Sequence, residues 1–454
     1  MTDKRPGQAA QRQDMGRGAV MRRSGVIGAG ALALLAACGQ PDERLPGTRI
    51  GVDLPGGAAA AGGTAVPLAL IAPVQNADWP QRGGGADRDI AHPALRADLA
   101  PLFRVAIGAA ETRRARITAE PVVAAGRVFA MDAQTGVSAF TTGGAALWRQ
   151  SLIPASDAAT DASGGGLATD GARVYATTGY GELVALDAAS GARLWTQDLG
   201  APGAGAPAVV GDMVYVVARD GQGLAIDAAS GRVRWRVSGV EDVSRFDGGA
   251  GPAVSGDLAV FPFASGEVIG VFPEGGRSRW SSVVAGRRPG RASALTVSGI
   301  SGDPVIEDGR VYVGNASGRI SALDGFTGET IWSAADGALG PVVPAGDALF
   351  LINDIGQLQR LDAATGTTVW RTDLPQGEAA GFLRRDRPTA HYGPILAGGR
   401  LLIASSDGVI RQADPVSGRL LGALPLEGGA ASAPIAAGGV LYVVTTDGAL
   451  AAFR

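Results

Sequence analysis

The sequence predicts an all-β protein, an eight-bladed β-propeller whose ring closes when an N-terminal strand pairs with the C-terminal blade. Three observations lead to this prediction. A repeat begins near residue 102, each copy contains several short β-rich runs, and the last copy stops early, at Arg454. A period of about forty residues with four short strands per unit is typical of a propeller blade.

Each copy opens with a short apolar run. Its β-branched and aromatic residues favour a pleated, half-buried strand, and we expect these strands to lie near the axis of the ring. The eight openings are VFAM (128–131), VYATT (174–178), VYVVA (214–218), AVFPF (259–263), VYVGN (311–315), LFLIN (349–353), LLIAS (401–405) and LYVVT (441–445).

A second strand then leads through a tight turn into a strand that carries tryptophan. An aspartate can start such a turn by accepting backbone N–H bonds, and a glycine follows where a positive φ is expected. The large amphipathic indole suits the wedge between neighbouring blades. We expect all these residues to be structural. They are Asp187, Asp227, Asp324, Asp362 and Asp414; Gly191, Gly231, Gly328, Gly366 and Gly418; and Trp148, Trp195, Trp235, Trp280, Trp332 and Trp370.

Two outer strands depart from this pattern. The seventh, LLGALPL (420–426), is predicted to have Leu421 in the tryptophan place. The eighth is missing after the last opening, but PLFRVAIG (101–108) has the outer-strand pattern, with Phe103 in the tryptophan place. Because open sheet edges invite aggregation, we expect residues 102–108 to pair with the C-terminal half-blade and complete the eighth blade.

The N-terminus has the pattern of an export signal. Arg22 and Arg23 precede the apolar run GVIGAGALALLAA (25–37), which is too short to span a bilayer as a helix. LAAC (35–38) resembles the lipobox of bacterial lipoproteins, in which the cysteine becomes the lipidated first residue. That resemblance implies that residues 1–37 are removed, that Cys38 carries the lipid, and that Gly39 directs the protein to the outer membrane. The alternative for a lone cysteine is burial as a free thiol.

Residues 38–95 are predicted to form a Gly/Ala/Pro-rich tether and lead-in, and residues 96–454 the propeller. Removing residues 1–37 takes away six of the 40 Lys and Arg residues and two of the 43 Asp and Glu residues. The remaining net charge of about −7 argues against nucleic acid as a partner. The only lysine, Lys4, is lost with the signal. Schiff-base chemistry and a phosphate-binding P-loop are thereby excluded.

The repeat units ALDAASGARLW (185–195) and ALDGFTGETIW (322–332) resemble the repeat of pyrroloquinoline-quinone (PQQ) dehydrogenase propellers. Together with the lipobox and the tether, eight such units resemble the BamB family of outer-membrane protein assembly lipoproteins. This resemblance implies a non-enzymatic scaffold on the periplasmic face of the outer membrane, without a cofactor. Its implied partners are the periplasmic domains of a BamA-like barrel insertase, to which it binds as a monomer within a hetero-complex.

Two other functions remain open: a PQQ-dependent dehydrogenase, or a lipoprotein that binds another periplasmic partner or a cell-wall polymer. A dehydrogenase resembling this repeat would use Ca²⁺, an aspartate base and often a pair of adjacent cysteines. Cys38 is the only cysteine, and none of the three asparagines lies in a carboxylate-rich run. His391, in HYGP (391–394), has no persuasive Ser-His-Asp arrangement around it. We therefore predict no catalytic residue and no metal ligand.

The predicted binding surface lies on long connections between blades, since loops on a rigid scaffold commonly carry function. In the BamB family, the surface that meets the barrel-forming partner lies on interblade loops between central blades. The loops 240–251 and 285–303 match by position, although they lack the family's Leu-x-Leu-Arg and Asp-x-Asp patterns. The candidate partner-binding residues are Arg245, Phe246, Asp247 and Asp303.

Overall fold

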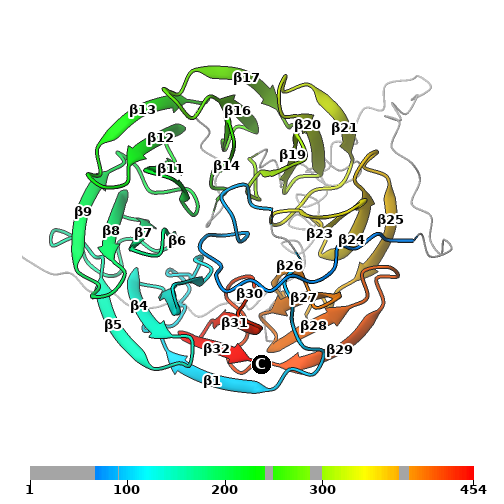
Figure 1. Ribbon diagram of the computed structural model, residues 1–454, viewed down its shortest axis with the longest axis horizontal. Helices are drawn as coiled ribbons and strands as arrows, with labels where there is room; N and C mark the ends of the chain where they lie inside the picture. Colours follow the sequence, from blue (N-terminus) through cyan, green and yellow to red (C-terminus); the bar gives the residue numbers. More distant parts are fainter. Residues whose placement is uncertain (1–66, 90–91, 241–248, 287–298, 378–387) are drawn as a thin grey trace, which may run out of the picture. The chain divides into compact units, whose positions relative to one another are not determined.

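The protein is described here by a computed structural model, which covers residues 67–89, 92–240, 249–286, 299–377 and 388–454. Within these residues the chain forms strands and turns, and no helix long and apolar enough to cross a membrane is found. The strands make eight antiparallel sheets of four strands each, arranged as blades around one axis (Figure 1). The predicted fold class, an eight-bladed propeller, is confirmed.

The blades are numbered in chain order. Within each blade, the strands are given from the innermost to the outermost. Blade 1 contains β2 (Val122–Ala124), β3 (Arg127–Met131), β4 (Gly136–Thr141) and β5 (Ala146–Ser151); blade 2, β6 (Gly165–Thr169), β7 (Arg173–Thr178), β8 (Glu182–Asp187) and β9 (Arg193–Asp198); blade 3, β10 (Ala208–Val210), β11 (Met213–Val217), β12 (Gln222–Asp227) and β13 (Val233–Ser238); blade 4, β14 (Ala253–Ser255), β15 (Leu258–Pro262), β16 (Glu267–Val271) and β17 (Ser278–Val283).

Blade 5 contains β18 (Val305–Glu307), β19 (Arg310–Asn315), β20 (Arg319–Asp324) and β21 (Thr330–Ala334); blade 6, β22 (Val343–Ala345), β23 (Ala348–Ile352), β24 (Gln357–Asp362) and β25 (Thr368–Asp373); blade 7, β26 (His391–Ala397), β27 (Arg400–Ser405), β28 (Val409–Ala413) and β29 (Leu420–Pro425); blade 8, β30 (Ile435–Ala437), β31 (Val440–Thr445), β32 (Ala449–Phe453) and β1 (Pro101–Ala106).

Blade 8 closes the ring as predicted, because its outermost strand comes from the other end of the propeller. β1 runs antiparallel to β32, with Arg104 opposite Ala451 and Ala106 opposite Ala449. Beyond the ladder, the N–H groups of Ala100 and Arg454 each donate to the other's carbonyl, at 2.9 and 2.8 Å. β1 thus supplies the fourth strand of the blade that contains the C-terminal copy.

The opening strands lie second from the axis, which corrects the position expected for them. In most blades, a separate strand of three residues lies inside the opening strand, as β2 does inside β3. The residues of β23, β27 and β31 are buried at every position instead of half-buried. These innermost strands could not be recognised in the sequence, because three residues are too few to show an alternating pattern.

The tryptophans join each blade to the next, as expected. The indole N–H of each of the six tryptophans in the outer strands donates to a backbone carbonyl of the following blade, and the ring lies against the turn glycine of that blade. At Gly231, where φ is +73°, an added Cβ would lie 2.7 Å from the ring of Trp195. The donor and acceptor pairs are Trp148 and Ala188, Trp195 and Ala228, Trp235 and Pro273, Trp280 and Gly325, Trp332 and Ala363, and Trp370 and Pro415.

The residue in the tryptophan place of β29 is Gly422 and not Leu421, which corrects the prediction. Every outer strand from β5 to β29 has an irregularity in register immediately before the tryptophan place, and in β29 the irregularity puts Gly422 there, opposite Gln412. Leu421 is exposed instead. A tryptophan at this place would lie against blade 8. Because blade 8 is built from two chain ends, no turn joins its third and fourth strands, and there is no turn glycine for the tryptophan to cover. Phe103 does take the tryptophan place in β1, since an added Cβ at Gly144 would touch its ring.

Replacing Gly231 by alanine is expected to destabilise the protein, because the new methyl group would collide with Trp195 in a left-handed backbone conformation. Gly256→Ala is a matched control, since Gly256 also has a positive φ, +56°, but has no atom within 4 Å of an added Cβ. We expect the free energy of unfolding to fall by about 1–3 kcal/mol more in Gly231→Ala. Denaturant titration measures the difference, and equal losses would contradict the wedge role of Trp195.

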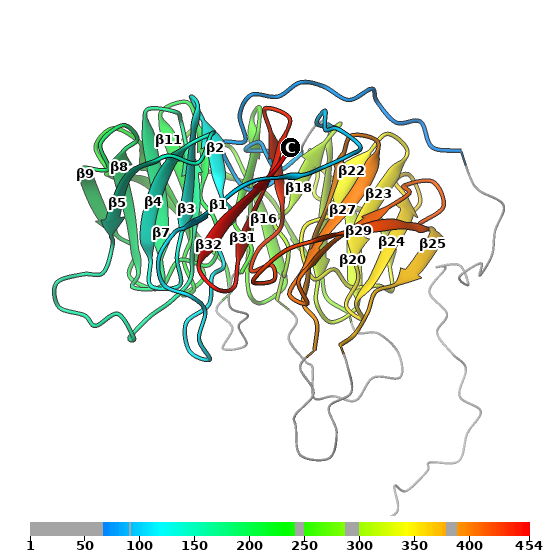
Figure 2. The same ribbon diagram turned by 90° about the horizontal axis from the view of Figure 1, so that it is seen from below.

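The segment 67–97, called the N-terminal strap below, crosses one face of the ring (Figures 1 and 2). The connection between β5 and β6 extends from the opposite face, called the interblade-loop face below (Figure 2). Most of the strap falls within residues 38–95, which were predicted to form a tether and lead-in. In the structure, residues 67–89 and 92–97 pack on the propeller, and Trp79 is among the most deeply buried side chains of the described chain.

Candidate functional site: the axial channel and the interblade-loop face

The N-terminal strap forms hydrogen bonds with all eight blades: with the innermost strands of blades 1 to 5, with β24 of blade 6, and with the first turns of blades 7 and 8. Trp79 exchanges two backbone hydrogen bonds with Val123 of β2, as an added strand would. The eight contacts are Trp79 with Val123, Pro80 with Thr169, Gln81 with Val209, Ala86 with Val254, Asp87 with Ile306, Pro67 with Arg360, Pro93 with Gly398, and Asn76 with Gly438. Residues 79–87 of the strap therefore lie in the axial channel, against the innermost strands of blades 1 to 5.

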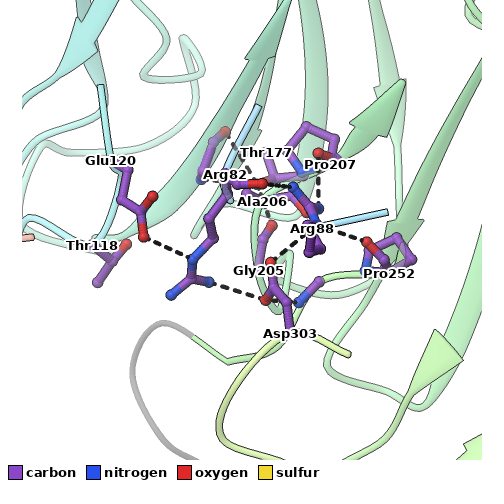
Figure 3. A network of polar contacts seen from close by, with 12 residues as sticks. Arg82, Arg88, Thr118, Glu120, Thr177, Gly205, Ala206, Pro207, Pro252 and Asp303 are labelled. Atoms are coloured by element: carbon purple, nitrogen blue, oxygen red, sulfur yellow. Dashed lines mark hydrogen bonds and ion pairs between the residues drawn. The ribbon is translucent and has the colours of Figure 1, made fainter. Parts of the chain in front are cut away.

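Four charged side chains form a buried cluster within this channel (Figure 3). Arg82 binds Glu120 through Nε and Asp303 through Nη1, both at 3.2 Å. The guanidinium of Arg88 lies 3.2 Å from the other oxygen of Asp303. The side chains of Arg88 and Asp303 are each only 1 % exposed. Two arginines from the strap thus balance two carboxylates from the ring.

The backbone completes the arrangement around Arg88. Its guanidinium donates to the carbonyls of Pro252, Ala206 and Pro207 at 3.1–3.2 Å, and to that of Arg82 at 2.8 Å. Buried charges are tolerated only when they are paired and hydrogen-bonded, and this group has both kinds of partner.

The pKa values in the cluster follow from this burial. Burial lowers the pKa of Arg88 and raises the pKa of Glu120. For Arg82, burial acts against the charge, but the attraction of Asp303 and Glu120 outweighs it, and the pKa is raised. Each charge in the cluster therefore depends on its neighbours.

Asp303 was predicted to contact a partner, and the structure corrects this prediction. The residue is 2 % exposed, and its carboxylate faces Arg82, Arg88 and the backbone N–H of Gly251. It therefore has no surface to offer a partner. The sequence could not reveal this burial, because Arg82 lies 221 residues away in the chain.

The other predicted partner-binding residues, Arg245, Phe246 and Asp247, lie outside the described residues, as does Cys38. The described ends of the loops 240–251 and 285–303 line a small pocket of about 50 Å³ on the interblade-loop face, between blades 3 and 4. Val240, Phe263 and Ile300 contribute apolar surface to it, and Val240 is 63 % exposed. The region chosen from the sequence therefore contains a concave, mainly apolar feature.

The two histidines have structural contacts. The imidazole of His391 lies 2.7 Å from the hydroxyl of Ser405 and 2.9 Å from the carbonyl of Pro375, and burial lowers its pKa. Ser405 is fully buried, so it is not available as a nucleophile. His92 contacts the carbonyl of Ile71 and accepts the N–H of Gly399. Among the described residues, no group of three His, Cys, Asp or Glu side chains could hold a metal ion.

A pair of carboxyl groups makes the strap's contact with blade 5 sensitive to pH. Burial, together with the charges of Asp87 and Asp308, raises the pKa of Asp89 to about 6. Burial also raises the pKa of Glu307 to about 7, and repulsion from Asp89 and Asp308 adds to it, with Arg310 acting the other way. The folded protein therefore keeps protons that the unfolded chain releases near pH 4.

From this we expect a stability contribution that is present below about pH 4 and lost as the pH rises to about 7. Denaturation midpoints at pH 5 and pH 7.5 measure it. The decline should be smaller in the double variant Asp89→Asn, Glu307→Gln than in the wild type. An identical decline in both proteins would contradict the assignment to these two groups.

Comparison with known proteins places these features in context. A family model described as outer membrane protein assembly factor BamB matches residues 133–372 and 356–454. Among curated proteins, none matches the chain. Solved structures that match include BamB from Moraxella catarrhalis, at 19 % identity over 79 % of this chain and 100 % of that chain, with a TM-score of 0.64.

Two enzymes of the same fold also match. A europium-containing methanol dehydrogenase is 15 % identical over 81 % of this chain and 90 % of that chain, with a TM-score of 0.63. A quinohemoprotein alcohol dehydrogenase from Comamonas testosteroni is 16 % identical over 83 % of this chain and 80 % of that chain, with a TM-score of 0.61. At these identities the structural matches establish the propeller fold alone.

Proposed function

The chain belongs to the family of the outer membrane protein assembly factor BamB, and from this premise we propose that it is a non-enzymatic scaffold subunit of the outer-membrane β-barrel assembly machinery. In this proposal Cys38 carries the lipid anchor, and the propeller lies on the periplasmic side of the outer membrane. Its interblade-loop face docks the periplasmic domains of a BamA-like insertase, and no bond is made or broken.

One observation carries the scaffold proposal furthest: residues 79–87 of the N-terminal strap lie against the innermost strands of blades 1 to 5, and the strap brings two arginines to the carboxylates there. The carboxylates at the axis, Glu120 and Asp303, are each paired with an arginine of the same chain. A carboxylate-lined axial cavity would have favoured a dehydrogenase, but these carboxylates are already engaged. The methanol and alcohol dehydrogenases share the fold, and the fold supports both kinds of function.

The docking surface is supported by the position of the long connections. They carry arginines next to an aromatic residue, as in Arg245–Phe246, a composition enriched at protein interfaces. The pocket between blades 3 and 4 lies at the described ends of the same loops. The proposed contact residues are Arg245, Phe246 and Asp247; Asp303 is not proposed as one because it is buried.

Co-purification from detergent extracts tests this function. The full chain is expected to recover a large outer-membrane barrel protein, and Arg245→Glu is expected to reduce that recovery about tenfold or more, as loss of an interface arginine can. Arg277→Glu is a control, because Arg277 is an exposed arginine in the turn between β16 and β17, which lies on the other face.

Other results would favour the alternatives. Recovery of cell-wall polymer or of an unrelated periplasmic protein, with no barrel protein, would contradict the proposed function. Alcohol oxidation by the chain after addition of PQQ would favour a dehydrogenase.

A further inference from the structure

We propose that the strap residues Arg82 and Arg88, joined by Asp303, form an internal brace that positions the ends of the loops 240–251 and 285–303. The inference rests on the proposed function, in which these loops meet the partner. Asp303, predicted to touch the partner, thereby becomes a positioning residue that acts from beneath the docking face.

The first support is that one carboxylate joins both loops. Asp303 is the last residue of the loop 285–303, and Gly251 is the last residue of the loop 240–251. Asp303 Oδ1 accepts the backbone N–H of Gly251 at 2.7 Å and also binds Arg82 at 3.2 Å. Within the described chain, the ends of the two loops are thus tied directly to each other and to the strap.

The second support is that Arg88 holds the next residue of the same loop end. Its Nε–H donates to the carbonyl of Pro252 at 3.1 Å, and its Nη2 donates to the carbonyls of Ala206 and Pro207 at 3.2 Å. Those two residues end the preceding connection, between blades 2 and 3. Two consecutive residues just before β14, Gly251 and Pro252, are therefore each held by a charged acceptor or donor, whose hydrogen bonds are stronger than neutral ones.

The third support is the close packing of the backbone around the brace. An added Cβ at Gly251 would lie 2.2 Å from the carbonyl oxygen of Ala206, and one at Gly205 would lie 2.4 Å from that of Gly249. No side chain separates the loop ends here. A shift of one connection is therefore transmitted directly to the next, because close-packed interiors have low compressibility.

Through the brace, the N-terminal strap would position the ends of the two loops. The strap follows the predicted lipid anchor in sequence, and its arginines lie directly beneath the proposed docking loops. Without Arg82 and Arg88, the carboxylate of Asp303 would be a buried charge without a cationic partner. Its hydrogen bond with the N–H of Gly251 would then have no contact with the strap to fix its position.

Hydrogen exchange of the full chain tests the brace without any partner. In Asp303→Asn, the amide exchange of residues 249–253 and 299–305 is expected to increase about tenfold. Arg82→Gln, a milder change at a partly exposed side chain, should give a smaller increase in the same peptides. Restoring the charge balance in the double variant Arg82→Gln, Asp303→Asn is expected to return the exchange part of the way to the wild-type rate.

Gln81→Ala is the matched control. Gln81 lies next to Arg82 in the strap and is buried, but both of its hydrogen bonds go to Val209 of β10 and neither reaches the two loops. We expect it to lower the denaturation midpoint while leaving the loop-end exchange and the recovery of the insertase unchanged. Asp303→Asn should lower that recovery about tenfold.

Two results would overturn the brace: unchanged loop-end exchange in both Asp303→Asn and Arg82→Gln, or equal increases in Gln81→Ala. Failure of the wild-type chain to recover any barrel protein would instead overturn the proposed function. The exchange comparison would still decide whether the brace positions the loops.

Discussion

Replacing Arg88 by methionine is expected to lower the free energy of unfolding by about 3–5 kcal/mol, the range for removing one partner of a buried ion pair. Asp303 and Glu120 would then have only Arg82 to balance them. The carbonyls of Pro252, Ala206 and Pro207 would also lose a donor. Methionine keeps much of the side-chain volume, so the loss reports mainly on charge and hydrogen bonding.

Arg116→Met is the control for Arg88→Met, because it removes an arginine from an exposed ion pair. Arg116 pairs with Glu111 at 3.0 Å, but its side chain is 54 % exposed, and pairs of this kind contribute about 1 kcal/mol or less. Denaturant titration of both variants beside the wild type gives the two losses. Similar small losses would contradict the view that the axial cluster holds the strap in the ring.

Deleting residues 449–454 is expected to prevent the protein from accumulating in soluble form. The deletion removes β32, so β1 loses its partner and β31 becomes an open edge. It also removes Leu450 and Phe453 from the core cluster between blades 7 and 1. The yield of soluble monomer, measured by size-exclusion chromatography, should fall to a few per cent or less of the wild-type yield.

Removing Arg454 alone is the graded control. This shorter deletion costs the two backbone hydrogen bonds with Ala100 but keeps the ladder between β1 and β32. It should yield soluble protein with a modestly lower denaturation midpoint. A soluble monomer with the wild-type midpoint after deletion of 449–454 would show that the ring does not depend on this closure.

The blade count and the closure could be predicted from the sequence because they rest on local patterns. A tryptophan such as Trp195 and a turn glycine such as Gly231 recur at fixed spacing, and the spacing follows from the geometry of one blade. Eight openings with only seven outer strands after them then implied a strand from elsewhere, and PLFRVAIG (101–108) was the run that matched.

The features that could not be predicted depend on distant contacts. Nothing local distinguishes Asp303 from an exposed loop aspartate, since its partners Arg82 and Arg88 come from the strap. The strap has no regular period, and only the isolated Trp79 in a Gly/Ala/Pro-rich region hinted at burial. The tryptophan place of β29 was assigned to Leu421 because leucine is the larger apolar residue, although the four-residue spacing from the turn glycine, as in Gly191 and Trp195, leads from Gly418 to Gly422.

The family to which the chain belongs and the contacts in the axial channel both support the proposed scaffold function. Residues 79–87 of the N-terminal segment lie against the innermost strands of blades 1 to 5, and the proposed docking surface lies on the interblade loops. The brace adds that the segment leading from the predicted lipid anchor is also the segment on which the proposed docking loops rest.

Site-specific photo-crosslinking in living cells tests the docking proposal most directly. A photoreactive phenylalanine analogue at position 246 is expected to capture the barrel insertase. The same analogue at position 326, an exposed phenylalanine in the turn between β20 and β21, should not capture it. Capture from position 326 and not from 246, or no barrel protein at either position, would contradict the account.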